Sequence, residues 1–130
     1  MILVDSSVWI DFLNGNDTEQ ANFLDRAIGK HEIAIGDLIF MEVLQGFKKE
    51  KDFNQVKYFL EEFSFFILVG KEIALQSALN YRRLRANGVP VRKTIDVLIG
   101  TFCIEKGVSL LHSDRDFDPM VAHLGLKSIF

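Results

Sequence analysis

The chain begins with the stretch Ile2-Leu3-Val4-Asp5-Ser6-Ser7, in which three apolar residues run directly into an acidic one. A short apolar run without alternation predicts a strand that is buried on both faces, as the strands of parallel sheets are. An aspartate directly after such a strand is costly to bury unless it is paired or binds a metal. This stretch therefore predicts a first strand over Ile2–Val4 and marks Asp5 as a candidate functional residue.

The rest of the chain repeats this pattern, with short apolar runs separated by segments of helical periodicity. Further strands are predicted over Ile33–Ile35, Phe65–Val69, Ser109–His112 and Lys127–Phe130. Helices are predicted over Ser7–Leu13, from Thr18 to Ile28, from Asp37 to about Gly46, from Asp52 through Leu60, over Glu72–Ala86, from Thr94 through Ile104, and after Asp118. Strands that alternate with helices predict an α/β fold with right-handed crossovers, in which helices cover both faces of a parallel sheet.

Length and composition are those of one globular domain. The chain has 130 residues, of which 48% are hydrophobic and 25% are charged, so we expect a single domain over residues 1–130. Its one cysteine, Cys103, allows no internal disulfide, which fits a reducing cytoplasm. Asp5 interrupts the first apolar run and no apolar stretch approaches the length of a membrane span, so neither a signal peptide nor a membrane anchor is expected.

Acidic residues follow, or lie close to, several of the predicted strands. Asp5 follows the first strand, Glu42 lies on the helix after the second, Asp96 lies in the first turn of the helix before the fourth, and Asp114 follows the fourth. Because ligands of open parallel sheets bind beyond the carboxyl ends of the strands, these side chains are expected to open on one edge. Considered alone, each acid also has a purely structural interpretation. Asp96 could serve no purpose beyond stabilising the helix dipole, and Asp116 could be a turn residue.

Converging carboxylates point to a divalent metal. They repel one another and would take up protons at neutral pH, a cost that a bound cation removes. Oxygen ligands without a neighbouring histidine or cysteine favour Mg²⁺ or Mn²⁺ over zinc. A carboxylate-held Mg²⁺ keeps open positions for water and phosphate, so the chemistry that this pattern suggests is metal-dependent hydrolysis of a phosphodiester.

Four blocks of the sequence resemble, in order and spacing, the motifs of PIN-domain nucleases, and in particular the VapC-type toxins of type II toxin–antitoxin pairs. The blocks are Val4-Asp5-Ser6-Ser7-Val8-Trp9-Ile10, Glu42-Val43-Leu44-Gln45-Gly46, Thr94-Ile95-Asp96-Val97-Leu98-Ile99-Gly100 and Ser113-Asp114-Arg115-Asp116-Phe117. The resemblance spans essentially the whole chain. It implies a sheet order of 3-2-1-4-5, endoribonuclease activity on RNA, a homodimer, and a VapB-like antitoxin as partner.

Carried over residue by residue, the resemblance implies an acidic quartet of Asp5, Glu42, Asp96 and Asp114. Of these, Asp5 and Asp96 would bind the metal directly, with Asp114 completing its ligands and Glu42 positioning or deprotonating the attacking water. Asp116 matches a variable fifth acid that assists through water, and Ser6 matches a hydroxyl that orients the site.

The formal net charge of −3 argues against a general nucleic-acid coat protein, but the charge is unevenly distributed. Residues 73–95 contain five basic residues and no acidic one. The last two of these basic residues, Arg92 and Lys93, are candidates for contacts with substrate phosphate. Two other functions remain open from the sequence. One is a non-catalytic PIN-fold module that binds RNA or protein, and the other is a phospho-receiver domain, which would need an acidic pair where Ser6 and Ser7 follow Asp5.

Overall fold

The five strands of the computed structural model, which describes residues 1–130, form one parallel sheet in the order β3-β2-β1-β4-β5. The strands are β1 (Ile2–Val4), β2 (Ile33–Gly36), β3 (Ser64–Phe66), β4 (Ser109–Leu111) and β5 (Ser128–Ile129). β1 lies at the centre, where Leu3 pairs with Ala34 on one side and with Leu110 on the other. The predicted fold class, including the strand order that the resemblance implied, is confirmed.

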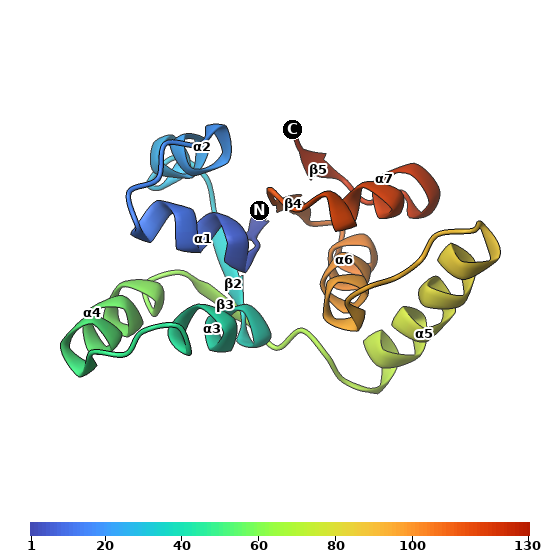
Figure 1. Ribbon diagram of the computed structural model, residues 1–130, viewed down its shortest axis with the longest axis horizontal. Helices are drawn as coiled ribbons and strands as arrows, with labels where there is room; N and C mark the ends of the chain where they lie inside the picture. The colour runs from blue at the N-terminus through green and yellow to red at the C-terminus, as the bar shows by residue number, and fades with distance from the viewer.

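Helices cover both faces of this sheet (Figure 1). The helices are α1 (Ser6–Leu13), α2 (Glu19–Ala27), α3 (Asp37–Leu44), α4 (Glu50–Leu60), α5 (Lys71–Ala86), α6 (Thr94–Lys106) and α7 (Asp118–Leu124), with a 3₁₀ turn, η1, at Arg115–Phe117. Because crossovers between parallel strands are right-handed, the helices on the way from β1 to β3 lie on one face, and those leading to β4 and β5 lie on the other. Figure 1 shows α1, α3 and α4 on one side of the strands and α5, α6 and α7 on the other.

The core lies on both sides of the sheet, and one part of it is aromatic. All three residues of β1 are buried, as are all four of β2. On the face covered by α1 and α4, Trp9 is completely buried and packs its ring at 5.1 Å from that of Phe63 and at 6.1 Å from that of Phe59. These contacts pack α1, whose first residues follow β1, against α4 and the segment that leads into β3.

On the other face, α5 and α6 pack against each other and are joined by a buried polar contact. The Asn80 amide donates a hydrogen bond of 2.9 Å to the Thr101 hydroxyl, which in turn donates to the Val97 carbonyl. Gly100 allows α6 to approach α7, because a Cβ at this position would lie 2.3 Å from Cε of Met120. This packing sets the position of the α6 N-terminus, where Asp96 lies in the first turn.

Some element boundaries differ from the prediction. The predicted third strand, Phe65–Val69, ends at Phe66, because the carboxylate of Asp37 accepts a hydrogen bond of 3.1 Å from the Leu68 amide and takes it away from the sheet. Asp37 is the first residue of α3 and Gly36 its N-cap, so the predicted cap is one residue off. Likewise α4 begins at Glu50 instead of after Asp52. None of the helices combines the length and hydropathy that a membrane span needs.

Candidate active site

Asp5 connects β1 to α1 and is one of the most buried acids of the chain. It is the N-cap of α1, and its Oδ2 accepts hydrogen bonds from the Ser7 hydroxyl at 2.7 Å and the Ser7 amide at 3.4 Å. The residue is only 4% exposed. Burial raises the pKa of Asp5, and the hydrogen bonds from Ser7 oppose this only in part. The local sequence thus explains why an acid can stand here: it caps the helix that follows the strand.

Asp96 is held with a carboxylate oxygen that has no protein partner. The residue is 8% exposed, and its Oδ2 is buried without a hydrogen bond. Burial and then repulsion from Asp5 raise the pKa of Asp96 to about 7, with Lys93 opposing the shift. A buried acceptor without a donor is expensive, and perturbed acids of this kind concentrate at functional sites.

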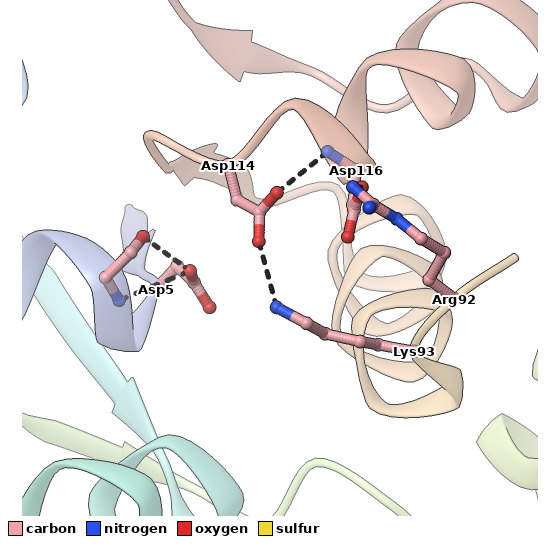
Figure 2. A network of polar contacts seen from close by, with 6 residues as sticks. Asp5, Arg92, Lys93, Asp114 and Asp116 are labelled. Carbon is pink, nitrogen blue, oxygen red and sulfur yellow. Dashed lines mark hydrogen bonds and ion pairs between the residues drawn. The ribbon is translucent and has the colours of Figure 1, made fainter.

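Asp114 and Asp116 follow β4 (Figure 2), and they complete an acidic cluster with Asp96. Asp114 is the N-cap of η1, and its Oδ1 accepts a hydrogen bond of 2.9 Å from the Asp116 amide. One carboxylate oxygen from each of Asp96, Asp114 and Asp116 lies within 4.8 Å of the other two. Three carboxylate oxygens at such separations are a donor set that suits a hard divalent cation, and the partnerless Oδ2 of Asp96 fits the same ligand.

Two basic side chains from the loop before α6 pair with this cluster. Figure 2 shows Lys93 pointing toward Asp114, and its Nζ lies 3.3 Å from the Oδ2 of Asp114. A guanidinium nitrogen of Arg92 lies 2.8 Å from the Oδ1 of Asp116. Burial alone would raise the pKa of Asp114, but the Asp116 amide, Lys93 and Arg92 outweigh it and the pKa is lowered. Asp114 is therefore an ionised, charge-paired carboxylate at neutral pH.

Glu42 reaches the same edge of the sheet from α3 and is half-buried. Burial, and then repulsion from Asp5, raise the pKa of Glu42, while Lys93 and the Ser6 hydroxyl act in the opposite direction. Asp5 thus raises the pKa of both Glu42 and Asp96. An acid whose pKa is shifted toward neutrality is a stronger base than an ordinary carboxylate.

A cleft of about 260 Å³ opens beside the cluster. Asp96 and Asp116 line it together with three basic residues, Arg92, Lys93 and Arg115. Acidic groups that can hold a cation, next to basic groups that can contact an anion, are an arrangement suited to a phosphate ester. Its lining comes from the end of α5, the loop before α6, the first turns of α6 and the η1 turn, so the cleft lies on the face of the sheet that α5, α6 and α7 cover.

The structure brings the predicted residues to one edge of the sheet, and it adds two residues that the sequence did not indicate, Ser7 and Arg115. Asp116 stands in the acidic cluster with Asp96 and Asp114, whereas the Asp5 carboxylate is turned toward Ser7. Ser7 was not singled out from the sequence, although an aspartate two residues before a serine at a helix start is a common capping pattern. Arg115 was also missed, since a single arginine in a turn carries no signal of its own.

Comparisons with known proteins match nearly the whole chain. The chain is 28% identical over 131 residues to a VapC ribonuclease of Mycobacterium bovis and to ribonuclease VapC11 of Mycobacterium tuberculosis, with 98% of this chain and 97% of each relative covered. The fold is similar to a chain of VapBC2 from Rickettsia felis, which was solved bound to a DNA fragment from its promoter. Here the TM-score is 0.78 at 16% identity, and 99% of this chain and 98% of that chain are covered. The PIN domain model matches residues 2–121, and the chain therefore belongs to the PIN domain family.

Proposed function

We propose that this protein is a Mg²⁺-dependent endoribonuclease, able to use Mn²⁺ as well, that hydrolyses RNA phosphodiester bonds. The observation that carries the proposal is the cluster of three carboxylates from Asp96, Asp114 and Asp116, beside a buried Oδ2 of Asp96 that no protein group satisfies. The names of the relatives as ribonucleases support the choice of RNA as substrate.

In this proposal Asp5, Asp96 and Asp114 hold the ion, and Asp116 contributes either directly or through a water molecule. Mg²⁺ is favoured because all the available donors are carboxylate oxygens, and no histidine or cysteine lies in the cluster. When bound, the ion supplies positive charge at the scissile phosphate and lowers the pKa of a coordinated water. Burial and then repulsion from Asp5 raise the pKa of Asp96 in the metal-free protein, and a cation held by these residues would favour the ionised form of Asp96.

Glu42 is the proposed base. Its raised pKa and its position near Asp5 suit it to orient the attacking water and accept its proton. The water oxygen bonds to phosphorus, the bond from phosphorus to the leaving oxygen breaks, and the leaving oxygen takes up a proton from solvent. The Ser6 hydroxyl, which stabilises the Glu42 carboxylate, keeps the base in place.

Arg92 and Lys93 are the proposed phosphate contacts. Both line the cleft beside the acidic cluster, and both are exposed. Because such contacts neutralise backbone charge without reading bases, their loss should weaken RNA binding across sequences alike.

We further propose that residues 1–130 act as one nuclease domain, as the toxin of a VapBC-type pair in the cytoplasm. The relatives are VapC ribonucleases, and one similar structure is a VapBC complex on DNA. On this basis a VapB-like antitoxin is the expected protein partner and a homodimer the expected assembly. Co-purification with a small DNA-binding protein encoded by a neighbouring gene tests the antitoxin partner. Light scattering tests the homodimer.

The activity is tested by cleavage of synthetic single-stranded and stem-loop RNAs in Mg²⁺, with and without EDTA. We expect cleavage that EDTA abolishes and that falls by at least about 100-fold in Asp5→Asn, as loss of a metal-binding carboxylate would cause. Asp52→Asn, at an exposed position on α4, is the matched control and should cleave like the wild type.

Two results would contradict the proposal. Undiminished cleavage by a folded Asp5→Asn protein would remove the assigned role of Asp5. Absence of Mg²⁺ or Mn²⁺ binding at millimolar concentrations in calorimetry would instead favour a non-catalytic PIN-fold module. Circular dichroism of each variant separates these results from unfolding, since Asp5 also caps α1.

A further inference from the structure

Lys93 occupies an unusual position in the acidic cluster, because its one ammonium group interacts electrostatically with several carboxylates. Its Nζ lies 3.3 Å from the Oδ2 of Asp114, and its charge also acts on Asp96 and Glu42. Figure 2 shows the side chain extended from the start of α6 toward Asp114. Lys93 is therefore the cation that partly offsets the mutual repulsion of these acids.

The two oxygens of Asp114 are engaged differently. Oδ1 accepts the backbone hydrogen bond of Asp116 that caps η1, and this bond is part of the fold. Oδ2 contacts only the Lys93 ammonium. The oxygen of Asp114 that takes no part in capping η1 is thus the one that Lys93 holds.

The pair between Arg92 and Asp116 differs in this respect. Arg92 contacts only Oδ1 of Asp116, which leaves the second oxygen of that carboxylate without a basic partner. The Arg92 side chain also extends further into solvent than Lys93 does, since it is 76% exposed and Lys93 is 57% exposed. A metal ligand from Asp116 is therefore compatible with the Arg92 pair, whereas one from Oδ2 of Asp114 competes directly with Lys93.

We propose that Lys93 is a resident counter-ion of the acidic cluster, which leaves Asp114 when a divalent cation binds and then contacts the RNA phosphate. The inference rests on the proposed function and adds to it a coupling between metal and substrate. A primary ammonium suits such an exchange, since it is a compact charge on a flexible stem and holds Asp114 through a single contact. A pair this exposed also separates readily.

The first test is Mn²⁺ binding, measured by calorimetry without RNA. Removing the competing charge in Lys93→Met should tighten the Mn²⁺ dissociation constant by about 3- to 10-fold, the scale expected for one partly screened neighbouring charge. Lys93→Arg keeps the charge and should bind Mn²⁺ within about twofold of the wild type. Lys106→Met, at the exposed far end of the same helix, is the matched control and should not change the constant.

The second test is RNA binding by fluorescence anisotropy in a Glu42→Gln background, which limits cleavage during the measurement. We expect Mn²⁺ to strengthen binding of a labelled single-stranded RNA, and Lys93→Met to remove most of that gain. A purely structural role for Lys93 would instead weaken metal and RNA binding together.

Unchanged or weaker Mn²⁺ binding in Lys93→Met would overturn the inference and leave the proposed nuclease activity standing. Tighter Mn²⁺ binding together with a wild-type protein that cleaves no RNA would support the counter-ion role and overturn the proposed function. If the wild type binds no Mn²⁺, both fall.

Discussion

Replacing Asp96 by asparagine should stabilise the metal-free protein at alkaline pH. In the fold, burial and repulsion from Asp5 raise the pKa of Asp96 from 3.8 to about 7. Between these values the folded state binds a proton that the unfolded state has released, so stability falls as the pH rises. Above about pH 7 the loss is complete, and the ionised carboxylate is then a net cost of the fold. Asparagine keeps the shape of the side chain and carries no such charge.

The size of the effect follows from the shift. A pKa change from 3.8 to about 7 corresponds to an upper limit of about 4 kcal/mol, at 1.36 kcal/mol for each pKa unit. The N-terminus of α6 borders the open cleft, so solvent screening reduces this, and we expect Asp96→Asn to raise the free energy of unfolding by about 1–2 kcal/mol at pH 8. More than half of the difference should be gone by about pH 5, where the folded wild type is protonated.

The assay is urea denaturation in EDTA at pH 5 and pH 8, for the wild type, Asp96→Asn and an Asp25→Asn control at an exposed position on α2. Adding Mn²⁺ at pH 8 should reverse the order, because only the wild type retains the full set of acids for the ion. If Asp96→Asn is no more stable than the wild type at pH 8, or if the difference between the two is the same at both pH values, the ionised Asp96 carboxylate is not a net cost of the fold.

Two further substitutions test how the fold holds the site. Asp37→Ala removes the carboxylate that joins the start of α3 to the Leu68 amide, and should cost about 1–3 kcal/mol in urea denaturation, with Asp37→Asn recovering part of it. Gly100→Ala forces a methyl group against the buried Met120 side chain and should cost about 1–3 kcal/mol; a thermal melt as stable as that of the wild type would show that Met120 can move aside.

The sequence predicts the layers of this fold well because each buried strand is an uninterrupted apolar run. Ile2–Val4 is such a run, and it lies at the centre of the sheet. The prediction fails at Phe65–Val69, an equally apolar run in which Ile67 is 73% exposed and Leu68 bonds to Asp37. That contact joins residues 31 positions apart, so local periodicity carries no sign of it.

The site was predicted in outline for a different reason. Asp5 and Asp114 follow strands that pair side by side, so the topology alone brings them to one edge. The orientation of each carboxylate within the site depends on local contacts. The Ser7 hydroxyl turns Asp5 toward α1, and the η1 turn places Asp116 in the cluster. Nor could the sequence show that Lys93 pairs with Asp114, because the two lie 21 residues apart on different elements.

The aromatic packing around Trp9 gives the molecule a built-in fluorophore. It is the only tryptophan of the chain, it stands on the helix that Asp5 caps, and its ring is enclosed by Phe59 and Phe63. When tryptophan is excited selectively, its emission therefore reports on the face of the sheet formed by α1 and α4, because the face carrying α5 and α6 contains no tryptophan. Comparing the emission with far-ultraviolet circular dichroism during unfolding shows, without any label, whether the two faces melt together or one after the other.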